Sequence, residues 1–294
     1  MRILITGVSG LLGSDVWNAC EQDNELIGLG RKRPGFVASS QWRDCDLTDP
    51  TKTYHTVSGC NPDAVVHCAA FSDVDKCEAD PEKAYRQNTL ATRNLALACQ
   101  RFDSALALIS TDYVFDGKDA PEGGYCEFDR TNPVSVYGQS KRDAEIIVKD
   151  LLCKFYIVRT SWLFGTGRPT YIDKVIETAE KGGKVPALSD IKSAPTYTLD
   201  LARSLSLLIS SRRYGIYHVT NSGFCTREEM AQYALRKQGL TSASLHVMRQ
   251  NDLKLAALRP SFSGLKNWMW SLDGFPKMRS WQEALDEYFK NRKR

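Results

Sequence analysis

Long hydrophobic runs and paired cysteines are missing from this chain of 294 residues, and each absence excludes a class of protein. No apolar stretch approaches the roughly 20 residues that span a bilayer, so we expect no membrane partner. The nine cysteines are scattered with no CxxC pair, which argues against a zinc site. Because their number is odd and no signal-peptide pattern precedes the β-type run at Ile3, we expect reduced thiols and a cytoplasmic protein.

An excess of one charge is absent too. Lysine and arginine total 39 against 35 aspartates and glutamates, a formal net charge of +4, so we expect no nucleic-acid partner. No spacing of acids, histidines or cysteines predicts a metal site, and we expect none. One basic run, expected to be a solvated helix end, consists of Lys290, Arg292, Lys293 and Arg294.

Short apolar runs alternate with helical patterns through the first 160 residues, which predicts βαβ units. The runs with the composition of buried strands are residues 3–6, 26–29, 64–68, 105–110 and 156–160. We therefore expect an α/β fold with a Rossmann-like, doubly wound parallel sheet and a smaller mixed α/β lobe. Residues 1–160 are expected to form the dinucleotide-binding domain, with later segments contributing, and residues 161–294 mainly the substrate-binding lobe.

Several helices are predicted from spacing and from capping patterns. Residues 81–102 carry a stripe at helical spacing, formed by Ala84, Asn88, Ala91, Leu95 and Cys99. A second long helix follows Pro133 and carries Tyr137, Lys141, Ala144 and Val148. The capping-box pattern that starts a helix occurs twice later in the chain, at Thr226 with Glu229 and at Ser280 with Glu283.

A glycine-rich turn follows the first predicted strand and opens the first helix. Its residues are Gly7, Val8, Ser9, Gly10, Leu11, Leu12 and Gly13. Glycines in this position allow a tight turn and a close approach of the backbone to a pyrophosphate, and the helix N-terminus offers free N–H groups. The strand before the turn and the helix after it favour dinucleotide binding over a purely structural turn.

Basic residues follow the second strand, where an NAD-selective site usually has an acid for the ribose hydroxyls. The run from Arg31 to Arg33 suits a 2′-phosphate, so the sequence favours NADPH, with NADH as an open alternative. Asp46 and Leu47 are expected to border the adenine. Small side chains at the end of another strand, Ala69 and Ala70, leave room for the cofactor.

Tyr137 and Lys141 are four residues apart on a predicted helix, and Ser110 and Thr111 end the preceding strand. The spacing places the phenol and the ammonium on one face. We expect the cation to lower the pKa of the phenol from about 10 and so to make Tyr137 a better proton donor near neutral pH. With a hydrogen bond from Thr111, this group could protonate a ketone while a nicotinamide supplies hydride.

These segments together resemble the extended short-chain dehydrogenases and, within them, the dTDP-4-dehydrorhamnose reductase family. The resemblance covers nearly the whole chain. Besides the glycine turn and the Tyr137 to Lys141 motif, the segments that carry it are residues 69–78, 110–117, 159–162 and 194–196, and Arg259-Pro260 with Ser263 and Leu265.

The resemblance implies roles that spacing alone does not give. Thr111, Tyr137 and Lys141 would be the catalytic residues, and Lys141 would also hold the nicotinamide ribose. The family reduces a dTDP-linked 4-keto sugar to dTDP-L-rhamnose, so the partner would be a small nucleotide sugar, with a homodimer as a candidate assembly. The positions that match residues lining the sugar are Ser72, Val74, Asp112 and Trp162, and we also place Ser72 beside the cofactor.

Arg259 has two interpretations. Its planar donor fork suits the diphosphate of the substrate. The alternative is an ion pair that braces the smaller lobe. The sequence alone does not choose between them.

Three other functions remain open. A nucleotide-sugar dehydratase or epimerase would share the fold, but dehydratases of this type place a further carboxylate after the strand-end Thr-Asp pair, where this chain has Tyr113. A reductase of another keto sugar would share every motif. A non-catalytic regulatory subunit, resembling that of methionine adenosyltransferase, would bind without turnover, although residues 74–78 and Trp162 look closer to the bacterial reductases.

Overall fold

A seven-stranded parallel sheet forms the centre of the molecule, with strand order β11-β6-β5-β4-β1-β2-β3. The structure, a computed structural model, describes residues 1–292, so Lys293 and Arg294 of the predicted basic run lie outside it. The strands are β1 Arg2–Thr6, β2 Glu25–Gly30, β3 Trp42–Asp44, β4 Ala64–His67, β5 Ala105–Thr111, β6 Phe155–Thr160 and β11 Gly215–His218. The predicted fold class is confirmed; β3 and β11 were not predicted.

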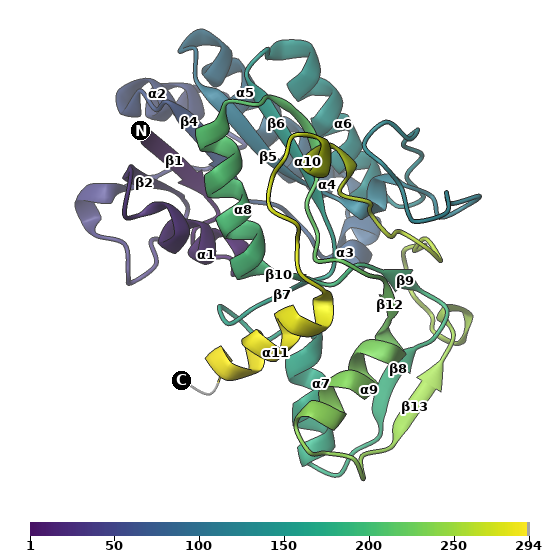
Figure 1. Cartoon of the computed structure of the whole chain (residues 1–294). Helices are drawn as coiled ribbons and strands as arrows, with labels where there is room; N and C mark the ends of the chain where they lie inside the picture. Colours follow the sequence, from purple (N-terminus) through teal and green to yellow (C-terminus); the bar gives the residue numbers. More distant parts are fainter. Residues whose placement is uncertain (293–294) are drawn as a thin grey trace.

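Helices cover both faces of this sheet (Figure 1). On one face, α2 (Pro50–Cys60), α5 (Ala91–Arg101) and α6 (Val136–Leu151) bury Val57, Leu95 and Val148 against the strands. On the other face, α1 (Leu11–Cys20), α8 (Thr198–Ser211) and α10 (Trp268–Leu272) bury Trp17, Leu205 and Trp270. Two covered faces explain why the strands are continuous apolar runs rather than alternating ones.

The helix predicted over residues 81–102 is present but is not regular. It begins as α4 (Pro81–Ala84), widens into a π-helical segment at Tyr85–Leu90 and continues as α5. The predicted stripe is buried along its whole length. In the wide turn, Asn88 donates to the Ser140 hydroxyl at 3.0 Å and Thr89 donates to the Ser140 carbonyl at 2.8 Å. Both neighbours therefore contact α6 from this π-helical segment.

The second group of elements forms the smaller, mixed lobe seen below the sheet in Figure 1. Its elements are α7 Tyr171–Glu180, α9 Arg227–Lys237, α11 Trp281–Arg292 and the paired short strands β7 Leu163–Phe164 with β10 Thr196–Tyr197, β8 Val185–Leu188 with β13 Leu245–Met248, and β9 Lys192–Ser193 with β12 Cys225–Thr226. Both predicted capping boxes are formed: Glu229 and Glu283 each bond back to the capping residue's backbone N–H. The short helix α3 (Val74–Ala79) belongs to the sheet domain and packs against α6.

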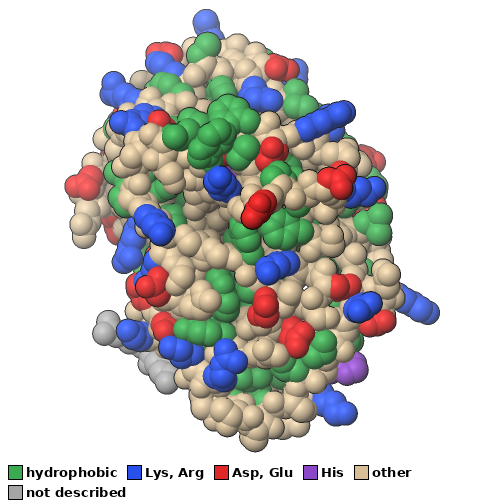
Figure 2. All heavy atoms as spheres, turned by 45° about the vertical axis from the view of Figure 1, so that its right-hand side comes forward, with side chains coloured by type: hydrophobic (Ala, Val, Ile, Leu, Met, Phe, Trp, Pro, Cys, Tyr) green, Lys and Arg blue, Asp and Glu red, His purple; other side chains and the backbone are tan. Residues whose placement is uncertain are grey.

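Positive and negative side chains are interspersed on the face shown in Figure 2, with no broad region of one sign. Within residues 1–292, no helix has both the length and the apolar character needed to cross a bilayer.

Candidate active site

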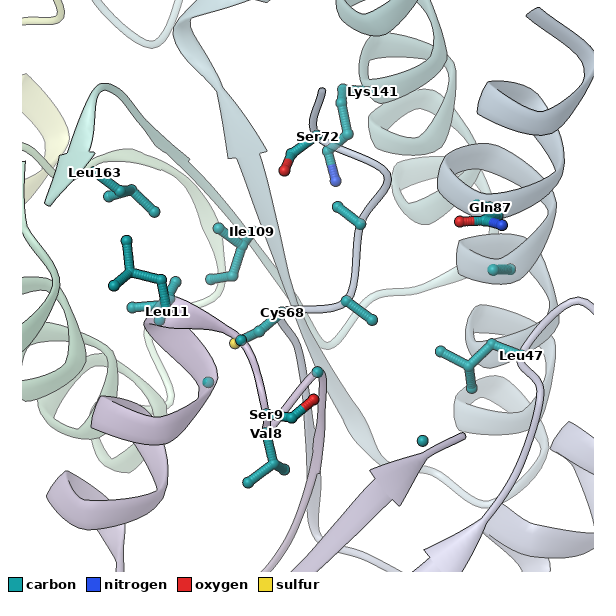
Figure 3. A pocket seen from close by; sticks show the side chains of 18 of the residues that line it. Val8, Ser9, Leu11, Leu47, Cys68, Ser72, Gln87, Ile109, Lys141 and Leu163 are labelled. Atoms are coloured by element: carbon teal, nitrogen blue, oxygen red, sulfur yellow. The ribbon is translucent and has the colours of Figure 1, made fainter. Parts of the chain in front are cut away.

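A cavity of about 760 Å³ opens at the carboxyl ends of β1, β2, β4, β5 and β6. In Figure 3 Lys141 and Ser72 lie at one side of it, Leu47 and Gln87 at another, and Leu11 and Leu163 opposite these. The predicted site residues that line it are Gly7, Gly10, Leu11, Leu12, Gly13, Arg31, Asp46, Leu47, Ala69, Ala70, Ser72, Val74, Thr111, Asp112, Tyr137, Lys141 and Trp162. Arg259 is the exception.

The glycine turn is built so tightly that side chains cannot replace its hydrogens. Gly7 has a φ of +69°, and a Cβ atom there would lie 2.7 Å from the backbone nitrogen of Ala69. A Cβ on Gly13 would lie 2.1 Å from the Gly7 carbonyl oxygen. Gly10 caps α1 without a side-chain hydrogen bond, so the first N–H groups of this helix remain available to a bound anion. The turn therefore fits the diphosphate of a dinucleotide.

The three predicted basic residues do not act together. Arg31 and Lys32 line the cavity, whereas Arg33 donates to the Val37 carbonyl at 2.5 Å. Next to Arg31, hydrogen bonds from Thr48 lower the pKa of Asp46, and the charge of Arg31 contributes to this shift. Two exposed cations thus remain at the end of the cavity beyond β2.

Tyr137 and Lys141 both face the cavity from α6, but the expected effect of the lysine on the phenol is wrong. Burial raises the pKa of Tyr137 above its ordinary value, opposed by a hydrogen bond with Thr111, and Lys141 is not among the causes. Burial also acts on the lysine and lowers its pKa to about 8, opposed by the nearby charge of Glu145. Desolvation is thus the largest cause of both shifts, so near neutral pH the phenol keeps its proton and the lysine titrates close to that range.

A buried polar network behind the catalytic face was not predicted. Ser110 donates to Glu145 at 2.5 Å, and Arg159 of β6 forms a bidentate ion pair with Glu145, with a shortest distance of 2.7 Å. Arg159 also contacts the buried ring of His218. Burial, together with the charge of Arg159, lowers the pKa of His218 well below its ordinary value. One feature of the sequence could have indicated this network: Glu145 continues the four-residue spacing of Tyr137 and Lys141.

Asp112 connects the end of β5 to the smaller lobe. Its carboxylate accepts hydrogen bonds from Thr111 at 3.1 Å, from Ser193 of β9 at 2.9 Å, and from Ser263. Burial raises the pKa of this carboxyl to about 6, against the lowering effect of the three hydroxyls. Asp112 therefore lines the cavity and at the same time joins segments far apart in sequence.

Trp162 adopts a left-handed backbone conformation, with a φ of +42°, two residues after the end of β6. Such a conformation is strained for a bulky residue and is commonly retained where a side chain must be aimed. Trp162 is half-buried and lines the cavity next to Ser161.

Arg259 does not line the cavity, and its donors are used elsewhere. Its guanidinium forms an ion pair with Asp75 of α3 at 2.5 Å and donates to the Ala257 carbonyl at 2.8 Å. These contacts agree with the ion-pair interpretation of Arg259 and do not support the diphosphate interpretation. Its partner Asp75 directly follows Val74, a predicted sugar contact, in the sequence.

Other cavity residues were missed because nothing in the sequence marked them. Arg168 reaches the cavity from the loop after β7, and Gln87 reaches it from the π-helical segment. Within residues 1–292, no group of three or more histidine, cysteine or acidic side chains is arranged to hold a metal ion.

The chain is similar over its full length to known nucleotide-sugar reductases. The model of a family described as RmlD substrate binding domain matches residues 1–294. The dTDP-4-dehydrorhamnose reductase of Streptomyces griseus is 35% identical over 296 residues, covering 98% of this chain and 93% of that protein.

Two solved structures agree. A dTDP-4-dehydrorhamnose reductase from Clostridium acetobutylicum has a TM-score of 0.91 and 32% identity, with 100% of both chains covered. That of Bacillus anthracis, in complex with NADP, has a TM-score of 0.86 and 32% identity, with 99% of both chains covered. The resemblance predicted from the motifs is confirmed, and the chain belongs to the RmlD substrate binding domain family.

Proposed function

We propose that this protein uses NADPH to reduce the 4-keto group of dTDP-4-dehydro-6-deoxy-L-mannose, which yields dTDP-L-rhamnose for polysaccharide biosynthesis. The observation that carries the proposal is a single cavity lined both by the glycine turn and by Thr111, Tyr137 and Lys141. The name of the Streptomyces griseus relative supports the same reaction. Because a fold hosts many activities, the sheet alone would not identify the reaction, whereas these residues and the family do support it.

The cofactor would extend from the glycine turn to α6. Backbone N–H groups at the start of α1 would bind its diphosphate, and Arg31 would bind the 2′-phosphate. Asp46 and Leu47 would border the adenine, while Ala69 and Ala70 leave space along the cavity floor. The NADP complex of the Bacillus anthracis relative supports NADPH. NADH is the second candidate. It lacks the 2′-phosphate, but the contact of that phosphate with the exposed Arg31 would add affinity only and would take no part in the chemistry.

The chemistry needs a hydride and a proton at the same carbonyl. When bound, NADPH supplies the hydride. Tyr137 would donate the proton to the carbonyl oxygen, and Thr111 would donate a hydrogen bond to that oxygen. Lys141 would hold the nicotinamide ribose and, by its charge, favour the phenolate that remains after proton transfer.

The sugar would lie between the two lobes. Ser72 and Val74 come from the loop that enters α3, and Asp112 comes from the end of β5. The indole of Trp162 offers an apolar face to the pyranose. Such a site, apolar on one side with a few fixed polar groups, is typical of small-molecule clefts.

We also propose the division into a dinucleotide-binding domain over residues 1–160, joined by later segments, and a mainly substrate-binding lobe over residues 161–294. The return of α8 and β11 to the sheet supports the contribution of later segments. A cytoplasmic enzyme with a nucleotide sugar as its partner, without nucleic acid, fits nine free cysteines and the mixed surface charge. A homodimer is the candidate assembly.

The test follows absorbance of the nicotinamide band. Purified protein is mixed with NADPH and with dTDP-4-dehydro-6-deoxy-L-mannose generated in place by the upstream enzymes, and a control omits the sugar. Sugar-dependent oxidation is the expected result. Oxidation with a different dTDP-linked keto sugar alone would change the substrate, and cofactor binding without any oxidation would move the assignment to the non-catalytic subunit.

A further inference from the structure

Arg227 lies next to the catalytic cavity: it does not line the cavity itself, but it stacks on Trp162, which does. In the β9–β12 pair, Cys225 is opposite Ser193, and the hydroxyl of Ser193 bonds to Asp112 at the cavity wall. Arg227 begins α9 two positions after Cys225. The charge of Asp112 acts on its guanidinium, which places Arg227 near the same wall.

Aromatic side chains hold the guanidinium in place. The Cζ atom of Arg227 lies 3.7 Å from the centre of the Trp162 ring and 4.6 Å from that of Tyr171. The hydroxyl of Tyr171 also donates to the Arg227 carbonyl at 3.1 Å. A stacked guanidinium keeps its edge N–H groups free to donate in the plane, which suits bidentate recognition of an anion.

Within residues 1–292 Arg227 forms no ion pair, since no carboxylate lies within 4.0 Å of its nitrogens. The charge of Asp112 acts on it only from farther away. In contrast, Arg159, Arg259 and Arg279 each form an ion pair. Arg227 is half-buried, and burial lowers its pKa against the opposing effect of neighbours that include Tyr171 and Asp112. A partly desolvated cation without an ion-pair partner is costly, and an anionic ligand in contact with it would reduce that cost.

We propose that Arg227 binds the diphosphate of the nucleotide sugar, an inference that rests on the proposed function. A pyranose stacked on Trp162 with its keto group at Tyr137 carries its diphosphate at the opposite end, toward the smaller lobe. Arg227 is stacked on that same indole. Arg259, the other basic residue considered for this role, is already paired with Asp75.

The experiment compares the wild type with Arg227→Gln and measures calorimetric affinities for dTDP and for thymidine. Saturating NADP⁺ is present so that dTDP cannot occupy the cofactor cleft. Because charge-assisted hydrogen bonds are strong, we expect the variant to bind dTDP about 10- to 100-fold more weakly, with thymidine affinity nearly unchanged. The KM for the sugar nucleotide should rise by a similar factor, and kcat should change much less.

Two variants control for charge and for packing. Arg236→Gln removes the same charge from the exposed last turn of α9 and should leave dTDP affinity unchanged. Arg227→Lys keeps the charge but not the planar fork, so it should recover part of the dTDP affinity.

The outcomes separate the inference from the function on which it rests. Equal dTDP affinity in the wild type and Arg227→Gln, with turnover retained, would overturn the inference alone. Equal weakening of dTDP and thymidine would also overturn it, because Arg227 would then only brace Trp162. A wild type that binds no dTDP would overturn the proposed function together with the inference.

Discussion

At the catalytic residues, burial dominates over the pairing that the sequence suggested. Tyr137 and Lys141 occupy the expected face of α6, yet each pKa moves in the direction that favours the neutral form. For an acid that must hold its proton until the hydride arrives, a raised pKa keeps the phenol protonated over the working range. The positive charge of Lys141 then matters after the proton has been transferred, when it stabilises the negative charge of the Tyr137 phenolate.

Tyr137→Phe should remove most turnover, by about 10²- to 10⁴-fold in kcat, because the proton donor is lost. NADPH affinity should stay within about threefold, since the missing interaction belongs to the transition state. Stopped-flow turnover and fluorescence titration with NADPH measure the two quantities. Tyr113 also lines the cavity, with its ring centre 6.1 Å from that of Tyr137. A larger loss in Tyr113→Phe would show that the proton donor had been placed on the wrong tyrosine.

Activity should fall on the alkaline side as Lys141 loses its proton. With a pKa of about 8, the ammonium is charged below that pH and neutral above it. The value of kcat/KM for NADPH, which reports groups of the free enzyme, should therefore decline as pH rises through about 8. Lys141→Arg retains the charge, so its smaller activity should lack this decline. A wild-type profile that is flat between about pH 6 and about pH 10 would contradict the assignment.

At the scale of elements, α6 carries three functional positions along one line. Tyr137, Lys141 and Glu145 follow at four-residue steps, and Glu145 joins α6 to β5 through Ser110 and to β6 through Arg159. The ion pair is almost fully buried, with side chains 3% and 4% exposed. The helix that presents the catalytic face is thus tied to the sheet directly behind that face.

Glu145→Gln should destabilise the protein by about 3–5 kcal/mol, because Arg159 would remain buried without its counter-charge. The double variant Glu145→Met with Arg159→Met should lose less than the sum of the single losses, since no uncompensated charge is left. Urea unfolding of the wild type, Glu145→Met, Arg159→Met and the double variant measures the difference. Additive losses would show that the two side chains stabilise the fold independently.

At the scale of the whole molecule, late segments return to complete the site. Ser193 and Ser263 reach Asp112, and Arg259 reaches Asp75 of α3. The cleft between the lobes is therefore held by contacts between residues more than 80 positions apart. These contacts fix the relative position of the two lobes in this structure.

Arg259→Gln and Asp75→Asn should show a coupling energy of about 1 kcal/mol in a double-mutant cycle, a modest value because solvent reaches Asp75 and screens the pair. The KM for the nucleotide sugar should change by less than about threefold, since the donors of Arg259 are already used by Asp75 and by the Ala257 carbonyl. Urea unfolding and steady-state kinetics give both numbers. A KM raised tens of fold without coupling would restore the diphosphate role to Arg259.

The sequence by itself determined the parallel sheet, the glycine turn, the helix with Tyr137 and Lys141, and the family. These features depend on local pattern: apolar runs, turn glycines and four-residue spacing are set by neighbours in the chain. For the same reason it missed the three-residue strand β3, which has too little sequence to form a pattern.

Only the tertiary structure decided which charges meet. It paired Arg259 with Asp75, left Arg227 on Trp162 without an acid, and placed Glu145 between Ser110 and Arg159. It also reversed the expected shift of the Tyr137 pKa, because desolvation depends on the packing around a group. Charges and burial are set by residues distant in sequence, so local spacing could name the catalytic groups but could not predict their environment.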